Sequence, residues 1–383
     1  MDVIYLDNNA TTRPDPRAVE AMMPYLTEFY GNPSSVHRFG QRSRSAVDTA
    51  RAQIARLVGA GESELTFTGG GTEAINTAVR SLAAMRLPRR TIVTTTVEHS
   101  ATRELCQQMA REGWIVVEIP VDHLGRLDAH RLRAEVSRDG VALASIMWAN
   151  NETGVIFAID EIAEICRAAR VPLHVDATQA IGKVRVDFRS LGIEMASFAS
   201  HKFHGPKGVG CLYARRGVRV APLLIGGPQE LGRRGGTENV PGIVGMGAAA
   251  EIAGREMVSM VRVTALRDRL EREIRKNVPD TFFNGDPTSR LPNTASVSFA
   301  ALEAEAILLL LSEQNICASA GAACSSGSLE PSHVLRAMGI ADRIAHGAIR
   351  FSLSRFTTDA EIDRALSVLP GVIARLRAVL PVG

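Results

Sequence analysis

Short apolar runs alternate with amphipathic segments along the first two thirds of the chain. The apolar runs are rich in β-branched residues and have the length of buried strands, whereas the segments between them show helical spacing. This alternation is typical of βαβ units, so the sequence predicts an α/β fold with a mostly parallel central sheet flanked by helices. The expected strands are residues 91–95, 114–119, 141–147, 171–175, 194–198 and 208–213, and the expected helices are residues 15–30, 36–58, 100–112, 128–137 and 158–170.

The pattern changes after residue 240. Residues 240–277 contain no proline after Pro241 and are rich in helix formers and charges, which predicts one long helix. Beyond them, short strand-like runs mix with helical stretches in an α+β pattern, with strands expected at residues 295–299 and 349–353 and helices at residues 303–311 and 358–369. We therefore expect a large domain over residues 15–255 and a smaller α+β domain built from residues 1–14 and 256–383.

Composition narrows the classes of partner. The chain has 383 residues, too many for one small core, and 45% of them are hydrophobic, as in ordinary globular proteins. Its formal net charge of +3 is too small to favour nucleic acid or a membrane surface as a partner. No apolar run approaches the roughly 18 residues of a membrane helix, and the N-terminus carries no basic leader. We therefore expect a soluble, cytoplasmic protein.

The chain has five cysteines, an odd number, and none of them forms a CxxC pair. This disfavours a disulfide framework or a structural zinc site, and most of the thiols are expected to be buried and inert. Cys324 differs because residues 318–328, ASAGAACSSGS, are almost all small and predict a mobile loop. An accessible thiol in such a loop is a candidate nucleophile, and a harmless exposed thiol is the alternative.

Two polar residues follow apolar strands at related places. Lys202 lies between the run MASFAS and a glycine-rich turn, and Asp176 ends the run VPLHVD. Because ligands bind at the carboxyl ends of strands in an open parallel sheet, we expect the two side chains to converge on one site. A lysine amine condenses with the aldehyde of pyridoxal phosphate (PLP), and a carboxylate keeps its pyridine nitrogen protonated. A solvated lysine and a structural turn aspartate are the alternatives.

A glycine-rich segment, GGGTEA, follows a strand-like run and opens a predicted helix at Gly71. Backbone N–H groups at a helix N-terminus, together with the Thr72 hydroxyl, suit a phosphate dianion. A simple capped helix is the alternative. The segment matches neither the GxGxxG nor the Walker pattern, which disfavours a nucleotide-binding Rossmann site.

Several other polar residues are candidates of lower specificity. His99 ends a strand and has the chemistry to stack on a flat ring and to move protons near neutral pH, although a core or surface histidine is the commoner case. Gln179 follows Asp176 by three residues and is either a cofactor ligand or a loop amide. The paired amides Asn150 and Asn151 indicate either turn chemistry or ligand contact.

Two arginines flank the apolar residues FSLS in a predicted strand. An arginine in such a strand needs a carboxylate or phosphate partner. For Arg350 and Arg355 that partner is either a structural acid or the carboxylate of a substrate.

Taken in order and spacing, the motifs of this chain resemble a cysteine desulfurase of the NifS type, within the class V aminotransferase-like PLP enzymes. The resemblance covers nearly the whole sequence. Its segments are YLDNNATT at 5–12, GNPSSVH at 31–37, GGTEA at 70–74, VEHS at 97–100, MWANNETG at 147–154, HVDATQAIGK at 174–183, SHKFHGPKGVG at 200–210, LLIGGPQELGRRGGTEN at 223–239, GAACSSGSLEPSHVLRAMG at 321–339 and IRFSLSRFTT at 349–358.

The resemblance implies a PLP-dependent transferase of fold type I, with Lys202 bound covalently to the cofactor. It implies that His99 stacks on the pyridine ring and that Asp176 pairs with the ring nitrogen. Arg350 is expected to grip the substrate carboxylate, and Cys324 to carry the persulfide, in a loop of about residues 318–330. The remaining implied roles are cofactor contacts by Asn151, which also lies near the substrate carboxylate, and by Gln179; phosphate contacts by Gly71, Thr72, Ser200 and His201, with Ala199 where many relatives have serine; and a contact from Thr237 to the phosphate of the other subunit in a homodimer.

The implied activity is removal of sulfur from L-cysteine, which gives alanine and a Cys324 persulfide. The sulfur would pass to an iron–sulfur scaffold or another acceptor, for nitrogenase maturation or for a housekeeping role. Selenocysteine as the substrate is a close variant that stays open. Two other functions stay open on the residues alone. A PLP aminotransferase or lyase would share Lys202 and Asp176 but give Cys324 no role, and a catalytically silent assembly scaffold would lack a PLP chromophore.

Overall fold

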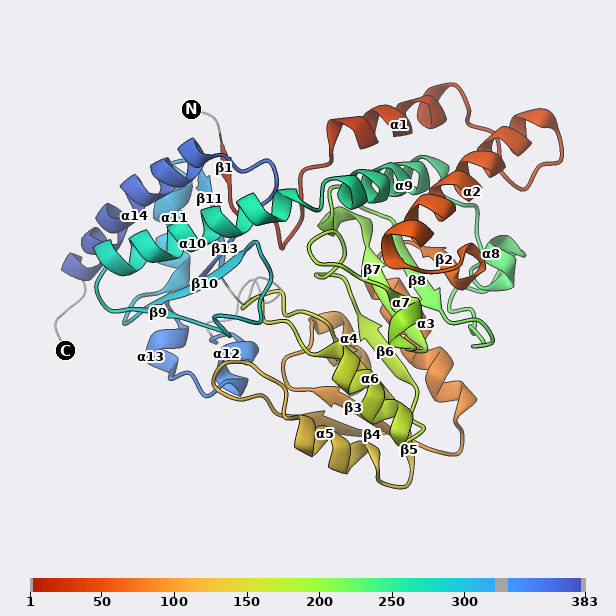
Figure 1. Ribbon diagram of the computed structural model, residues 1–383, viewed down its shortest axis with the longest axis horizontal. Helices are drawn as coiled ribbons and strands as arrows, with labels where there is room; N and C mark the ends of the chain where they lie inside the picture. The colour runs from red at the N-terminus through yellow and green to blue at the C-terminus, as the bar shows by residue number, and fades with distance from the viewer. Residues whose placement is uncertain (1–2, 321–329, 380–383) are drawn as a thin grey trace.

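The computed structural model describes residues 3–320 and 330–379 (Figure 1). Its largest sheet has seven strands in the order β2-β8-β7-β6-β5-β3-β4. The strands from β7 to β4 pair in parallel, and only β8 runs antiparallel to its neighbours. The predicted α/β class and mostly parallel sheet are therefore confirmed. The strands are β2 (Leu65–Thr68), β3 (Thr91–Thr95), β4 (Ile115–Ile119), β5 (Val141–Met147), β6 (Leu173–Asp176), β7 (Met195–Ala199) and β8 (Gly210–Ala214).

Helices cover both faces of this sheet. The apolar residues of α3 and α4 form one cluster with Ala142, Leu143 and Met195, whereas Ala144, Ile146 and Ala196 belong to the cluster on the other face. Residues of β5 and β7 thus enter both cores, which is why these strands are largely apolar. The helices of this part are α1 (Pro16–Thr27), α2 (Arg38–Val58), α3 (Gly71–Met85), α4 (Ser100–Arg111), α5 (Ala129–Val136), α6 (Ile159–Ala168), α7 (Phe188–Leu191), α8 (Gln229–Gly232) and α9 (Val240–Arg255).

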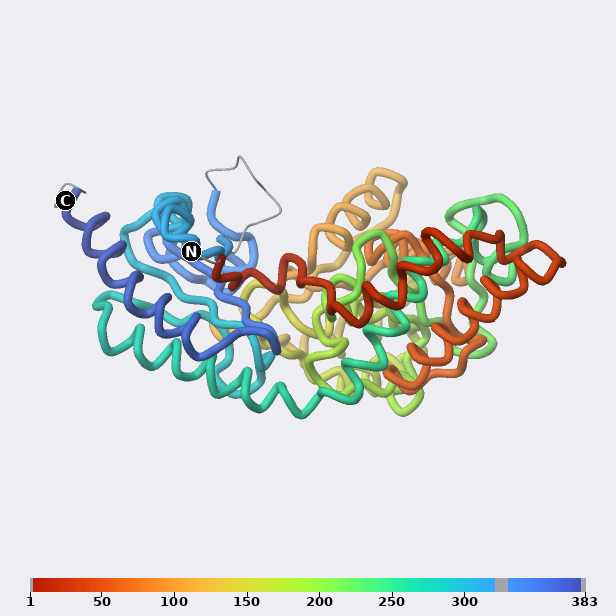
Figure 2. The backbone as a smooth tube through the Cα atoms, turned by 90° about the horizontal axis from the view of Figure 1, so that it is seen from above, coloured from red at the N-terminus to blue at the C-terminus, as the bar shows by residue number. Residues whose placement is uncertain are grey.

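A second, antiparallel sheet of order β12-β13-β10-β9 packs with three long helices around its own apolar cluster. Residues near the N-terminus join it, because β1 pairs with β11 and both Ile4 and Leu6 lie in this cluster (Figure 2). The division at residues 14/15 and 255/256 stays a prediction. The elements here are β1 (Ile4–Tyr5), α10 (Ser259–Asn277), β9 (Thr281–Phe283), β10 (Thr294–Phe299), α11 (Ala304–Glu313), β11 (Ile316–Cys317), β12 (Ser319–Ala320), α12 (His333–Ala337), α13 (Asp342–Ala345), β13 (Ala348–Ser352) and α14 (Asp359–Val379).

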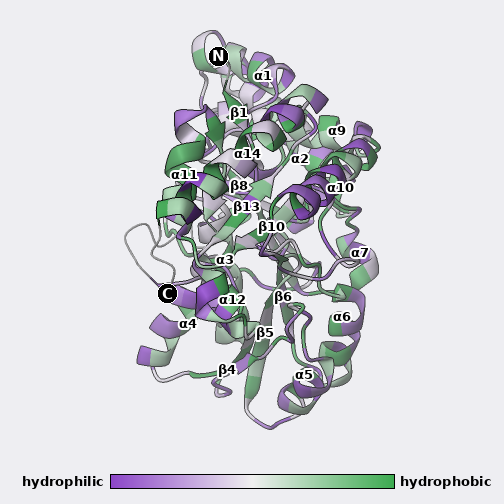
Figure 3. Ribbon diagram, turned by 90° about the vertical axis from the view of Figure 1, so that its left-hand side faces the viewer, coloured by the Kyte–Doolittle hydropathy of each residue, from purple (hydrophilic) through white to green (hydrophobic). Residues whose placement is uncertain are grey.

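The prediction of a single long helix over residues 240–277 is wrong. The structure has two helices, α9 and α10, separated by residues 256–258. α9 is mostly buried in the first core, whereas α10 has only one face buried in the second and carries many hydrophilic residues (Figure 3). The chain therefore has to turn between two cores, and Glu256 pairs there with Arg17 and Arg355.

Among the described residues, no helix is long and apolar enough to cross a membrane.

The short helices and strands that were predicted near residues 91–95, 141–147 and 100–112 begin and end within about a residue of the expected places.

Candidate active site

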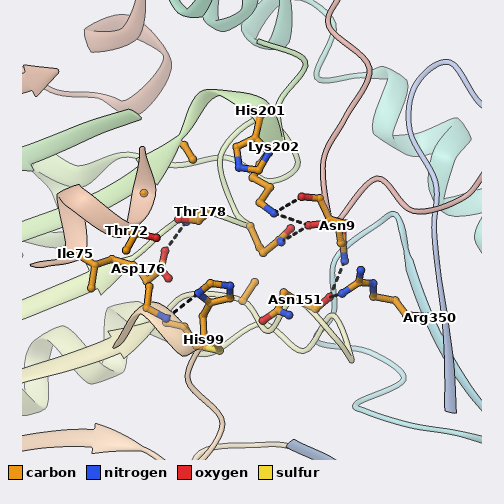
Figure 4. Close-up of a pocket in the computed structure, with 17 residues that line it drawn as sticks. Asn9, Thr72, Ile75, His99, Asn151, Asp176, Thr178, His201, Lys202 and Arg350 are labelled. Atoms are coloured by element: carbon orange, nitrogen blue, oxygen red, sulfur yellow. Dashed lines mark hydrogen bonds between the residues drawn. The ribbon is translucent and has the colours of Figure 1, made fainter. Parts of the chain in front are cut away.

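A cavity of about 310 Å³ lies at the carboxyl ends of the central strands, where the second sheet meets the first (Figure 4). Asp176 ends β6, Ala199 ends β7, and Gly71 begins α3. Ten of the residues singled out in the sequence line this one cavity, namely Gly71, Thr72, His99, Asn151, Asp176, Gln179, Ala199, His201, Lys202 and Arg350. We call it the Lys202 cavity.

Lys202 ends a short 3-10 turn, η2 (Ser200–Lys202), that directly follows β7. Its Nζ donates to the backbone oxygens of Asn9 and Ala10, each at 2.7 Å. Its neighbour His201 contacts the Thr11 hydroxyl at 3.1 Å through Nδ1. Burial, together with the charge of Lys202, lowers the pKa of His201 to about 4, so this ring is neutral near pH 7.

One end of the cavity is built to receive an anion. α3 starts there at Gly71, and its N-cap residue, Gly70, supplies no side-chain hydrogen bond to the free N–H groups of the first turn. A Cβ atom added to Gly71 would lie 3.5 Å from both the Thr178 hydroxyl and the Ala199 methyl group. The start of α3 therefore lies close to both of these side chains. The Thr178 hydroxyl is buried and has no partner among the described residues. A phosphate oxygen would satisfy both the hydroxyl and the helix N–H groups.

His99 is the N-cap of α4, and its Nδ1 accepts a hydrogen bond of 3.1 Å from the Ala101 N–H. An imidazole nitrogen that accepts carries no proton, so the neutral ring is held in the tautomer with hydrogen on Nε2. Asp176, at the end of β6, is nearly buried, and its Oδ1 accepts from the Thr178 N–H at 3.0 Å. The cavity therefore presents an oriented imidazole and a buried carboxylate.

Asn9, which sequence reasoning did not single out, connects the two sheets beneath Lys202. Its side-chain oxygen accepts from Lys183 and Asn293 at 3.0 Å each, and its amide nitrogen donates to Thr294 at 2.8 Å and to the backbone of Asn151. Burial and two neighbouring cations hold the pKa of Lys183 well below its usual range. Asn9 belongs to the segment YLDNNATT, but the residues around it do not indicate that its side chain is buried and bonded to residues far away in the chain.

Arg350 reaches the cavity from β13 and is already paired. Its Nη2 donates to Asp7 Oδ1 at 2.7 Å and its Nη1 to the Asn151 carbonyl at 3.0 Å, while its buried Nε has no partner among the described residues. Arg355, by contrast, binds the structural acid Asp15 at 2.5 Å. A substrate carboxylate at Arg350 would therefore compete with Asp7.

Two buried carboxylates lie behind the cavity. Burial, aided by the charge of Asp176, raises the pKa of Glu98 to about 8, and burial raises that of Glu152 to about 7. Glu98 Oε1 accepts from the Met147 N–H at 3.0 Å, and its other oxygen has no partner among the described residues. Folding therefore favours the protonated form of Glu98.

Glu98→Gln is expected to change how stability depends on pH. Because the folded pKa of Glu98 lies above the unfolded value of 4.5, its favourable contribution is complete below pH 4.5 and is lost as pH rises through about 8. The free energy of unfolding of the wild type, measured in urea, should fall relative to that of the variant by a few kcal/mol, roughly, over this range. Glu164→Gln, on the exposed face of α6, is the control, and a wild-type-to-variant difference independent of pH would contradict the assignment.

The comparisons with known proteins now decide the family. A family model described as aminotransferase class-V matches residues 4–365, which is nearly the whole chain.

The chain belongs to the class-V aminotransferases.

Within this family the similar curated proteins are cysteine desulfurases. The chain is 52% identical over 381 residues to "Cysteine desulfurase 2" of Trichormus variabilis, which spans 100% of this chain and 96% of that protein. It is 52% identical over 380 residues to "Cysteine desulfurase NifS" of Azotobacter vinelandii, covering 99% of this chain and 94% of the other. A solved structure named "NIFS-LIKE PROTEIN" superposes with a TM-score of 0.92 at 38% identity over 98% of this chain and 100% of its own. The predicted resemblance and fold type are confirmed.

Three of the predicted site residues of this class-V aminotransferase are not among the described residues that line the Lys202 cavity. The Ser200 side chain is buried against Gly205 and does not line the Lys202 cavity, and its hydroxyl has no partner among the described residues. Thr237 is exposed in a separate cavity beside Gly69. Cys324 lies outside the described residues. The roles of all three stay predictions.

The remaining cysteines are described and differ in exposure. Cys106, Cys166 and Cys211 are buried, and burial raises the pKa of each thiol to about 12. Such thiols are not ionised near neutral pH and are poor nucleophiles. Cys317, in β11, is partly exposed.

Proposed function

We propose that this chain is a PLP-dependent cysteine desulfurase that converts L-cysteine to L-alanine and keeps the sulfur as a persulfide on Cys324. The observation that carries the proposal is the convergence of Lys202, Asp176 and the uncapped start of α3 on one cavity. An amine, a buried carboxylate and an anion cradle are the three groups that PLP requires. The substrate class, cysteine, is proposed because the chain is 52% identical to proteins named cysteine desulfurase.

The residues of the cavity fit the cofactor. The Lys202 amine would hold its aldehyde carbon, and Asp176 would face its ring nitrogen. The N–H groups of Gly71 and Thr72, with the Thr178 hydroxyl, would bind the phosphate, and His99 and Gln179 would position the ring. When bound, PLP withdraws electrons from the substrate Cα and thereby weakens the bond between Cβ and sulfur.

Each side chain of the site has its own proposed role in the reaction of L-cysteine. Arg350 binds the substrate carboxylate in place of Asp7, with the Asn151 amide beside it. The Lys202 amine, between the carbonyl groups of Asn9 and Ala10, takes the proton from Cα. His99, with its proton on Nε2, is oriented to donate toward the substrate. The Cys324 thiolate would form a bond to the substrate sulfur as the bond between Cβ and sulfur breaks. The electron pair of the broken bond stays with the carbon skeleton, which takes up protons at Cβ and Cα and leaves as alanine.

The assembly that we propose is a cytoplasmic homodimer that passes sulfur to an iron–sulfur scaffold or another acceptor. Large apolar side chains are exposed at Tyr30, Val36, Ile225 and Leu231, at 75%, 89%, 90% and 71%. All four lie in or beside the segments 31–37 and 223–239 of the family motifs. Burying them against a second copy would remove this apolar surface from water and would bring Thr237 toward the partner's phosphate. Supply of sulfur for nitrogenase maturation is the proposed role of the product.

Product analysis tests the activity. The PLP-loaded protein is expected to release alanine from L-cysteine in an amount equal to the sulfide formed with a thiol reductant. An aminotransferase would instead release a keto acid, and a silent scaffold would release neither product. Detection of a keto acid, or of no alanine, would refute the proposal.

A further inference from the structure

A second cavity, of about 280 Å³, lies at the amino-terminal ends of the central strands, opposite the Lys202 cavity. It is formed where α3 and α6 end and where β6 and β7 begin, with residues just after β8. Much of its wall is apolar, and these residues are Leu82, Met85, Ala163, Val171, Pro172, Leu173, Ile193 and Val218. The Lys202 cavity lies at the other ends of β6 and β7, about 15 Å away by the length of a strand of four or five residues.

Four arginines and a single glutamate also line this second cavity, namely Arg86, Arg167, Arg170, Arg215 and Glu194; we call it the arginine cavity. The glutamate is already used, because its Oε1 pairs with Arg215 at 2.5 Å and its Oε2 accepts from the Leu173 N–H at 2.9 Å. Among the described residues, the three other arginines have no carboxylate partner. The cavity thus carries an uncompensated positive charge beside an apolar wall.

Helix ends explain only part of this arrangement. Cations are favourable at the C-terminus of a helix, and Arg86 follows α3 while Arg167 lies in the last turn of α6. Each also donates to a backbone oxygen, Arg86 to that of Arg170 and Arg167 to that of Leu191. Neither effect accounts for the Arg86 Nε atom, which is buried and has no partner among the described residues. The Arg170 side chain is exposed to solvent and makes no hydrogen bond in the described part of the chain, so it is open to a ligand.

We propose that the arginine cavity binds a small phosphate-bearing molecule with an apolar, planar body, of the chemical class of a nucleoside monophosphate. Guanidinium groups match the geometry of phosphate oxygens, and three of them without an acid would hold a dianion. The apolar wall gives such a ligand a surface for its ring system, and the volume suits one small molecule. The site differs from the phosphate cradle at Gly71, which the cofactor would fill.

Adenosine monophosphate is the probe that tests this site. Isothermal titration calorimetry is performed on the protein saturated with PLP, so that the phosphate cradle of the Lys202 cavity is occupied. Saturable binding of one equivalent per chain is expected. Arg170→Gln is expected to weaken it about tenfold, the loss that goes with one charge-assisted hydrogen bond. Arg86→Gln provides a second, independent variant should the first not fold.

The controls separate this site from general attraction of anions. Arg216→Gln removes the same charge from an exposed arginine next to Arg215 that does not line the cavity, and it should bind like the wild type. Inorganic phosphate and adenosine should each bind at least tenfold more weakly than the intact probe, roughly, because each lacks one half of the contacts. The proposal is overturned if the wild type shows no saturable binding. It is equally overturned if all three variants bind alike, or if either fragment binds as tightly as the whole molecule.

Discussion

Lys202→Ala is expected to abolish alanine formation from L-cysteine, with a loss of roughly 10³-fold or more. The amine has two tasks in the proposed reaction, covalent attachment of the cofactor and removal of the Cα proton. Among the described residues that line the cavity, Lys202 is the only lysine, so no other lining residue of the described part can take over either task. The measurements are alanine released per enzyme and, separately, cofactor fixed to the protein after borohydride reduction, detected by mass spectrometry of the peptide that contains residue 202.

Lys207→Ala is the matched control for this experiment. Lys207 lies five residues further along the same glycine-rich turn, but it is exposed and does not line the cavity. Its variant should retain both cofactor attachment and turnover. If Lys202→Ala still carried PLP on a lysine peptide and formed alanine at the wild-type rate, the assignment of the cofactor lysine would be refuted.

The convergence of Lys202 and Asp176 could be predicted because it depends on a rule of topology. In a parallel sheet the carboxyl ends of neighbouring strands meet at one edge, and β6 and β7 are neighbours in the structure. Each residue had only to be recognised as the end of an apolar strand, which is local information. The same rule explains why His99 and Gly71 lie at that edge, since each begins a helix after a strand.

Contacts between segments far apart in the chain could not be predicted in this way. Asn9 accepts a hydrogen bond from Lys183, which follows strand β6 of the first sheet, and donates one to Thr294 in β10 of the second. Its role appears only when the N-terminal segment is seen to cross between the two. The hydroxyl of Thr178 is another example, because its burial with no partner in the described part of the chain is a property of the folded cavity. The break between α9 and α10 had the same cause, since a helix-forming sequence does not reveal that its two halves serve different cores.

Paired amides show how far local interpretation reaches. The sequence left turn chemistry and ligand contact open for Asn150 and Asn151, and the structure divides the two functions between them. The Asn150 oxygen accepts from the N–H groups of Glu152 and Thr153, each at 2.9 Å, and so closes a turn. Asn151 lines the cavity. The turn made by the first amide is therefore what presents the second.

Both flanks of the segment that contains Cys324 lie beside the Lys202 cavity. On one side, Ser319 in β12 pairs with Arg350 of β13, which lines the cavity. On the other side, the Ser332 hydroxyl donates to Glu152, and His333 contacts the backbone oxygen of Glu98 at 3.0 Å, directly before His99. Position 324 lies four residues beyond position 320 in the chain, and an extended chain of that length spans about 14 Å.

Cys324→Ala is accordingly expected to retain covalently attached PLP while alanine formation falls by roughly 10³-fold or more, as when a nucleophile is removed. Three of the other thiols are excluded as substitutes because they are buried with raised pKa values, which leaves Cys317 as the residue to test against it. Cys317→Ala should therefore form alanine normally. Mass spectrometry after incubation with L-cysteine should show one added sulfur atom in the wild type and in Cys317→Ala, and none in Cys324→Ala. If the added sulfur followed residue 317 instead, the sulfur carrier would be the partly exposed thiol of β11, and the proposed role of the 318–330 loop would be wrong.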